Sequence, residues 1–248
     1  MGPWRLEAIR LWRTRRLIVL GATFLILGLG GPILAHYLPD IAAHSASDGV
    51  RISVPPPTPA DGIAAYAQNI GQLGTLVVAL AAGASLAIDA RPGLAVFYRT
   101  RLRRPASLVL PRYLAVTGAA VAALALGTLG AWYETAVLIG PLHPAQLAAG
   151  FGLETLWLCF ATAVVAALAS VLRGGLSAAG WALALLIGLA ALGGLPALSS
   201  WVPARLASSL ASVTGAHPPV LWHAAMVAGL VTPVLLSVAV VRLGRREP

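Results

Sequence analysis

The stretch Asp89–Arg112, DARPGLAVFYRTRLRRPASLVLPR, is strongly basic and lies between two long apolar runs of the sequence. It carries six of the 17 basic residues, all of which are arginine. A segment this basic between hydrophobic runs is typical of a loop on the cytoplasmic side of a membrane. We therefore expect a membrane protein in which this stretch connects two transmembrane spans.

The middle of this stretch has the pattern of a short helix rather than a loop. Pro92-Gly93 precedes it and Pro105 ends it, as expected for residues that interrupt helices. Arg99 and Arg103 lie opposite an apolar face, which Arg101 interrupts. The residues that recur on that face are Leu94, Phe97, Tyr98 and Leu102. The helix either lies on the lipid surface and fixes the topology, or docks onto a partner protein.

The composition excludes an ordinary soluble domain. The 248 residues are 58% hydrophobic and 10% charged, whereas about 25% of the residues of globular domains are charged. The formal charge of +9 could attract nucleic acid, but the arginines flank apolar runs, so we expect anionic lipid and no nucleic acid as the partner. The single Cys159 has no partner for an intrachain disulfide.

The absence of lysine from the sequence has two consequences. A phosphate-binding Walker A loop requires a lysine, so this chain does not hydrolyse ATP by that route. Arginine without lysine, together with many Ala, Gly and Leu residues, is typical of a GC-rich bacterial genome. We therefore expect a multi-pass protein of a bacterial cell membrane.

The apolar runs predict an all-α integral membrane protein with one transmembrane domain, 1–248. Small residues such as Ala79, Gly83, Ala184 and Gly188 favour close helix packing in lipid. The six expected spans are about residues 17–35, 69–88, 113–136, 147–172, 176–195 and 220–241.

Three further segments complete the expected organisation. Residues 1–16 predict an interfacial helix with Trp4 and Trp12 at headgroup depth, the alternative being the start of a signal peptide. Residues 36–68 contain three aspartates and a proline run, which predict an external loop. Residues 196–219 are too polar to span a membrane, and their apolar stripe predicts a short helix or an outer re-entrant segment.

The arginines are distributed unequally across this topology. Fifteen of them fall on the side that holds both termini and the basic stretch, whereas only Arg51 and Arg205 fall on the other side. Because cytoplasmic loops carry the excess of positive charge, we expect both termini in the cytoplasm.

Four polar residues within or at the spans are candidates for a substrate path. They are Asn69, Gln72, Glu134 and Glu154. The two glutamates lie on consecutive spans, and they form either a solvated pair at the outer interface or a polar patch in a substrate path. No residues have the spacing of a metal site or of catalytic groups, so we expect a protein that is not an enzyme.

The order of these elements resembles that of a type-2 ATP-binding-cassette (ABC) transporter permease. The local motifs are the early Arg-rich segment, Gly31-Pro32, Val54–Pro59 with Tyr66–Gln72 after it, and Trp201-Val-Pro203 before the last span. Asp89, Arg91 and Gly93 match the opening of the family's cytoplasmic loop, with Asp where Glu is commoner. The resemblance covers nearly the whole chain.

This resemblance implies a permease that pairs with a second, identical or homologous permease. Each would bind a separate ATPase subunit, which holds the ATP and Mg, so that this chain itself carries no cofactor. The helix in the basic stretch would be the coupling element, formed by Asp89, Arg91, Gly93, Leu94, Phe97, Tyr98, Arg99 and Leu102.

The function implied by the resemblance is the export of a hydrophobic drug, natural product or lipid. Two other classes stay open from the residues alone: a non-transporting membrane assembly or scaffold protein, and an intramembrane enzyme. An enzyme requires polar groups that converge at membrane depth. A copurifying ATPase would separate a permease from an assembly protein.

Overall fold

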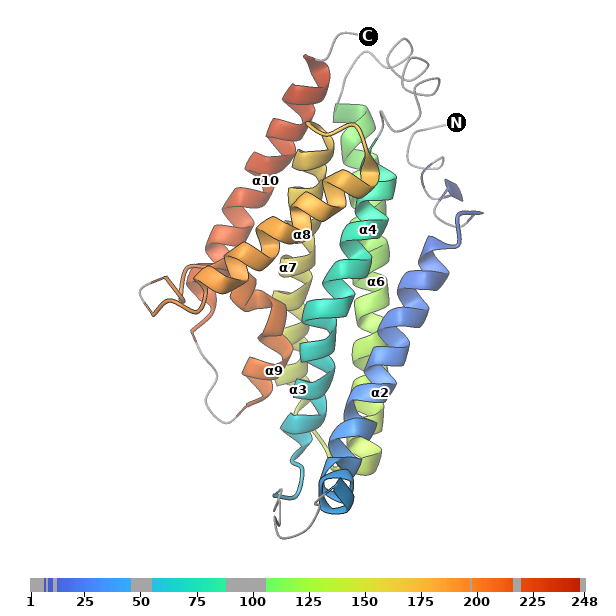
Figure 1. Cartoon of the computed structure of the whole chain (residues 1–248), viewed down its shortest axis with the longest axis vertical. Coiled ribbons are helices and arrows are strands. Elements are labelled where there is room, and N and C mark those ends of the chain that lie inside the picture. The colour runs from blue at the N-terminus through green and yellow to red at the C-terminus, as the bar shows by residue number, and fades with distance from the viewer. Residues whose placement is uncertain are drawn as a thin grey trace.

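The protein is a bundle of long helices (Figure 1). This computed structural model describes residues 7, 9–10, 13–45, 55–87, 106–196, 198–215 and 220–245. Six helical segments are long and apolar enough to cross a membrane, which confirms the predicted number of spans. In the described part of the chain there is no β-strand.

The first two segments are longer than expected. Helix α2 covers Arg16–Ser45 and continues through Pro32 and Pro39, beyond the predicted end of the first span near Ala35. The second segment begins with α3 (Pro59–Asn69), passes through a π-helical turn, η1 (Ile70–Gly74), and ends with α4 (Thr75–Leu86). The predicted loop over 36–68 is therefore helical at both ends.

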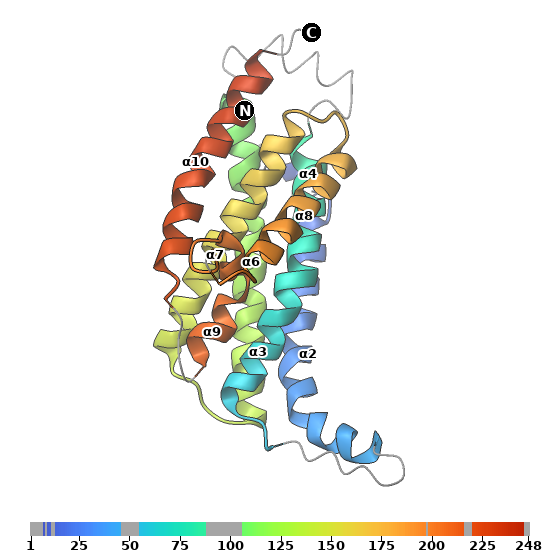
Figure 2. The same ribbon diagram turned by 60° about the vertical axis from the view of Figure 1, so that its left-hand side comes forward.

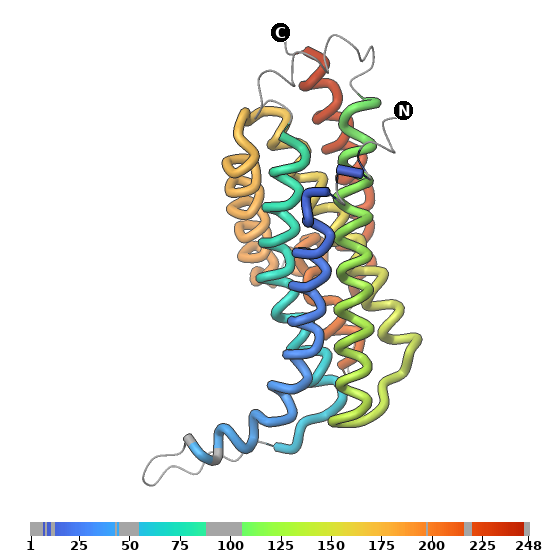
Figure 3. Tube along the Cα trace, turned by 90° about the vertical axis from the view of Figure 1, so that its right-hand side faces the viewer, coloured from blue at the N-terminus to red at the C-terminus, as the bar shows by residue number. Residues whose placement is uncertain are grey.

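Local sequence explains these two helices. Lipid has no water to satisfy free backbone groups, so an apolar chain stays helical even through prolines. The prolines still remove backbone hydrogen bonds, and the last turns of α2 bend away from the bundle (Figure 3). Helix α3 begins at Pro59 because Thr58 donates its backbone N–H to Asp61 Oδ2 at 2.8 Å.

The other segments follow the predicted order. Helix α6 spans Ala106–Leu138, and α7 (Pro144–Ala169) follows a short turn. Helix α8 spans Gly175–Leu192, and α10 spans Trp222–Gly244. Because α6 begins at Ala106 rather than near Tyr113, its first turns belong to the predicted basic loop. The first turn of α2 and the last turn of α10 lie at the same end of the bundle (Figure 1).

Helix α7 lies at the centre of the bundle and contacts α4, α6, α8, α9 and α10. Side-chain hydrogen bonds join it to α6: Thr117 and Thr162 are 2.9 Å apart, and the Tyr113 hydroxyl donates to the Cys159 carbonyl at 2.9 Å. Such polar contacts stabilise helix pairs in lipid, where apolar burial does not favour association.

Glycines bring two other helix pairs close together. A Cβ on Gly28 of α2 would overlap the Gly127 carbonyl oxygen of α6, and a Cβ on Gly83 of α4 would overlap that of Gly175 in α8. The predicted packing role of Gly83 is therefore confirmed. Ala184 and Gly188, in contrast, are exposed on the outer surface of α8.

Two short helices follow α8 in the chain and precede α10. They are the 3-10 helix η3 (Pro203–Ser208) and α9 (Ser209–Thr214). Leu206 and Leu210 of the predicted apolar stripe are fully buried. Helix α9 contacts α3 and α7, beside which it lies in Figure 2. The prediction of a short helix in this segment is confirmed.

Candidate functional site

The end of α4 and the start of α6, which flank residues 88–105, lie at the end of the bundle where α2 begins (Figure 1). Helix α4 ends at Leu86 and α6 begins at Ala106, and the two helices contact each other. The predicted coupling residues lie outside the described residues. They are Asp89, Arg91, Gly93, Leu94, Phe97, Tyr98, Arg99 and Leu102. The structure does describe the contacts of α4 and α6, the two helices on either side of them.

On α6, a contact close to residues 88–105 is made by Arg112. It belongs to the stretch predicted to be a cytoplasmic loop, but it lies in the second turn of α6, and its side chain is only 3% exposed. Its Nε donates to Glu7 Oε1 at 2.9 Å, and Glu7 also lies 3.6 Å from Arg10. A buried guanidinium requires such a partner, because an unpaired charge in a low-dielectric environment is costly. The pair therefore ties the N-terminal segment to α6.

The end of α4 is contacted by Arg16. This first residue of α2 donates from Nη1 to the Ser85 hydroxyl and from Nη2 to the Ala84 carbonyl oxygen at 3.3 Å. Ser85 lies one residue before α4 ends at Leu86. The N-terminal part of the chain thus contacts both helices that lead into the basic stretch.

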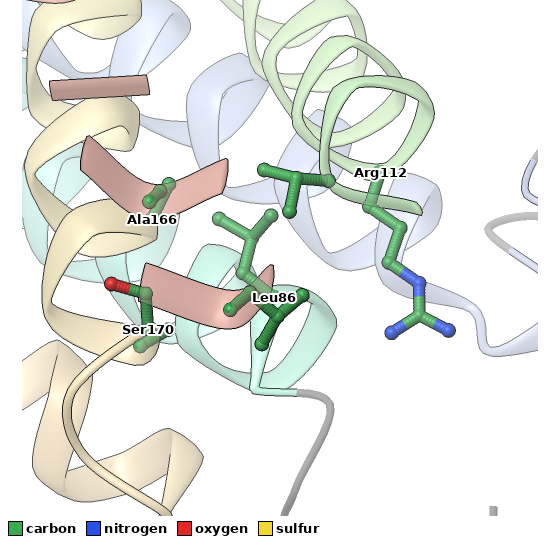
Figure 4. A pocket seen from close by; sticks show the side chains of 8 residues that line it. Leu86, Arg112, Ala166 and Ser170 are labelled. Atoms are coloured by element: carbon green, nitrogen blue, oxygen red, sulfur yellow. The ribbon is translucent and has the colours of Figure 1, made fainter. Parts of the chain in front are cut away.

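A small cavity lies beside Arg112, where α4, α6, α7 and α10 meet (Figure 4). Leu86, Val109, Ala166 and Ser170 line it together with Arg112. Its volume is about 10 Å³, which is room for about one water molecule. It is too small for a substrate, so this region supports the helix ends rather than binding a ligand.

Glu154, one of the four predicted path residues, is buried and hydrogen-bonded. It lies on α7, is 1% exposed, and accepts a hydrogen bond from the Ser209 hydroxyl at 3.2 Å. The backbone N–H groups of Ser209 and Leu210 also interact with its carboxylate. Glu154 therefore caps the N-terminus of α9, where a carboxylate is favoured by the free N–H groups and the helix dipole. It is not a solvated residue of the outer interface.

Glu134 has a different environment. It is partly exposed near the end of α6, and within the described residues no hydrogen bond joins it to Glu154. Glu154 is buried, whereas Glu134 is partly exposed, so the two carboxylates have different environments. Their role in a substrate path stays a prediction.

Asn69 and Gln72, the remaining predicted path residues, lie at the π-helical turn. Asn69 is the last residue of α3 and is partly exposed, whereas Gln72 lies within η1 and is exposed. Another part of the turn is packed: a Cβ on Gly71 would lie 2.9 Å from the Ala207 carbonyl oxygen. π-Helical turns occur frequently at functional sites, and no sequence pattern used above predicts one.

The chain is similar to a transmembrane protein of Bacillus subtilis (strain 168). The two sequences are 25% identical over 199 residues, which cover 79% of this chain and 77% of that protein, an uncharacterized transmembrane protein called YxlG. No protein-family model matches the chain. Together with the six apolar helices, this similarity identifies the chain as a multi-pass membrane protein.

The described residues contain no cluster of potential metal ligands. No group of three His, Cys, Asp or Glu side chains among them is arranged to hold a metal ion. Ser209 and Thr162 are buried, but their hydroxyls donate to carbonyl or carboxylate oxygens of α7. These polar groups stabilise helix contacts.

Proposed function

We propose that this chain is the permease subunit of a type-2 ABC exporter. It forms the substrate path with a second permease, and a separate ATPase subunit drives it. The observation that carries the proposal is the double attachment of the N-terminal segment, through Arg16 to α4 and through Glu7 to Arg112 of α6. A coupling element must transmit force to the spans, and fixed helix ends on both sides of residues 88–105 suit that task.

The charge distribution supports a cytoplasmic position for this element and for both termini. Fifteen arginines belong to the same side of the six-span topology, and positive charge is enriched in cytoplasmic loops. A bacterial ATPase would bind at this surface. It would contact one face of the proposed coupling helix, formed by the apolar residues Leu94, Phe97, Tyr98 and Leu102. Short helices with such anchors bind in grooves of partner proteins.

Exposed amides support a path or a partner next to α3 and η1. Gln68 and Gln72 are both exposed, and Gln72 lies near the middle of the Pro59–Leu86 segment. Polar side chains at membrane depth usually face a protein partner or a water-filled cavity, because lipid does not satisfy their hydrogen bonds. We infer that a second permease or the substrate path covers this face.

Helix α8 offers a surface for close approach of the second permease. Gly180, Ala184 and Gly188 recur every four residues and are exposed. At about 100° per residue they lie opposite the buried Ala178, Ala182 and Leu186. Small residues at this spacing permit close packing of helices in lipid. Under the same proposal η3 and α9 form the outer re-entrant segment.

The proposal is tested by purifying the tagged chain from membranes of its native host. We expect an ATPase with a Walker A sequence to copurify, two permease chains in the complex by native mass, and ATP hydrolysis that hydrophobic drugs, natural products or lipids stimulate. A membrane assembly protein would copurify with other membrane subunits and no ATPase. That result would replace the permease proposal.

A further inference from the structure

A groove lies at the end of the bundle opposite the start of α2. It is bounded by the bent end of α2, the coil Pro55–Thr58 and the first turns of α3, and its volume is about 450 Å³. Figure 3 shows α2 turning away from the bundle in this region. Sites for drug-sized ligands usually have about 300–1,000 Å³, so the groove is large enough for a small organic molecule.

The walls of the groove are apolar and partly rigid. Leu34 and Leu38 of α2 face Ala64 of α3 across it, and three consecutive prolines, Pro55–Pro57, close one side. Among the described residues that line it, only Asp61 and Gln68 have polar side chains. A largely apolar groove with a few polar groups is the usual composition of a binding site for an amphipathic molecule.

Asp61 supplies a carboxylate in a fixed orientation. Its Oδ2 accepts the Thr58 backbone N–H at 2.8 Å and the Thr58 hydroxyl at 2.7 Å. Both bonds go to the same oxygen, so Oδ1 keeps its capacity to interact with a ligand. No basic side chain of the described chain forms an ion pair with Asp61. Capping of the N-terminus of α3 explains the two hydrogen bonds from Thr58 to Asp61. It does not explain why the Asp61 carboxylate also lines an apolar groove.

The surrounding charge favours a cation. The last turns of α2 and α6, which carry Asp40 and Glu134, lie at the same end of the bundle as the first turn of α3, which carries Asp61. The first turns of α2 and α6 and the last turn of α10, which carry Arg16, Arg112 and Arg242, lie at the opposite end (Figure 1). Such a separation produces a negative potential at the groove, which attracts positively charged ligands.

We propose that this groove binds an amphipathic organic cation. Its apolar body lies against Leu34, Leu38 and the prolines, and its cationic centre lies at Asp61 with Gln68 beside it. This binding requires only the chain itself. Ligand binding therefore tests the groove, whereas copurification of an ATPase tests the permease proposal, and either proposal can fail without the other.

The experiment measures binding of tetraphenylphosphonium to the purified full chain in nanodiscs by equilibrium dialysis. We expect saturable binding that Asp61→Asn weakens about fivefold, the size of a partly exposed ion pair, since asparagine still accepts the bonds from Thr58. Ala64→Trp fills the groove and should abolish binding. Asp40→Asn, the matched control, removes an exposed carboxylate that does not line the groove, and it should weaken binding by less than about twofold, because that charge contributes only to the screened surface potential.

A neutral ligand of similar size, triphenylphosphine oxide, separates charge from apolar contact. Its binding should be lost in Ala64→Trp and unchanged in Asp61→Asn. Absence of saturable binding by the wild type, or wild-type affinity in Ala64→Trp, would overturn the site. Equal affinity of wild type and Asp61→Asn for the cation would overturn the assignment of its charge class.

Discussion

Arg112 of α6 donates from Nε to the carboxylate of Glu7 at 2.9 Å, across 105 positions of the chain. The arginine side chain is 3% exposed and the glutamate 14% exposed. A charge this buried is tolerated because the carboxylate compensates it. The pair thus gives the N-terminal segment a fixed place beside the helix that follows the basic stretch.

Breaking this pair should destabilise the protein. Glu7→Gln removes the negative charge that lies 2.9 Å from the buried guanidinium, and we expect the free energy of unfolding to fall by about 1–3 kcal/mol. Arg10→Gln is the matched control, because its contact with Glu7 is longer, 3.6 Å, and its side chain is 31% exposed, so the contact should contribute less than about 1 kcal/mol. Unfolding by SDS in mixed micelles measures both. Equal losses in the two variants would contradict the importance of Arg112.

The contact between α9 and α7 should depend on Ser209. Its hydroxyl bonds to the Gly150 carbonyl at 3.1 Å and to Glu154 Oε2 at 3.2 Å, and the side chain is fully buried. Ser209→Ala should cost about 1–2 kcal/mol, because buried acceptors lose their donor. Ser199→Ala removes an exposed hydroxyl and should change stability by less than about 0.5 kcal/mol. The same unfolding assay compares them, and a neutral Ser209→Ala would show that α9 is held by apolar contacts alone.

Two glycines of α2 should respond oppositely to alanine. A Cβ on Gly28 would overlap the Gly127 carbonyl oxygen, so Gly28→Ala forces α2 and α6 apart and should cost about 1–3 kcal/mol. A Cβ on Gly30 meets no atom within 4 Å. Gly30→Ala should therefore be neutral or stabilise the helix by up to about 1 kcal/mol. If both variants unfold alike, the close approach of the two helices is not a source of stability.

The orientation in the membrane is tested by cysteine labelling in intact cells. In a Cys159→Ala background, an impermeant maleimide should label Ser53→Cys and should not label Ser107→Cys. The reason is the preference of arginine for the cytoplasmic leaflet, which is worth about 1 kcal/mol per residue near an anionic surface. Labelling of Ser107→Cys alone would reverse the topology.

The helical bundle could largely be predicted from the sequence, because runs of apolar residues must form helices in lipid. The main errors concern Pro59–Gln68 and His36–Ser45, whose prolines and polar residues are typical of loops. In the structure Asp61 caps α3, and α2 continues through its prolines with a bend. A local pattern did not distinguish a loop from a helix end that contains these residues.

The contacts of the candidate sites could not be predicted in the same way. Glu154 was recognisable as an unusual charge, but its partner Ser209 lies 55 positions away, and the partner of Arg112 lies 105 positions away. Such pairs depend on how α7 packs against α9, and on where the N-terminal segment lies. Neither is encoded in a periodic pattern of one segment.

The central claim is that residues 94–102 dock onto a separate ATPase. The most direct measurement is the amount of ATPase that copurifies with tagged wild type, Phe97→Ala, Tyr98→Ala and Arg103→Ala. If the aromatic residues are anchors, each alanine variant should lose about 2 kcal/mol of binding, about a thirtyfold weaker complex, or uncouple ATP hydrolysis from transport, while Arg103→Ala changes mainly salt sensitivity. Wild-type retention and coupling in both aromatic variants would contradict the claim.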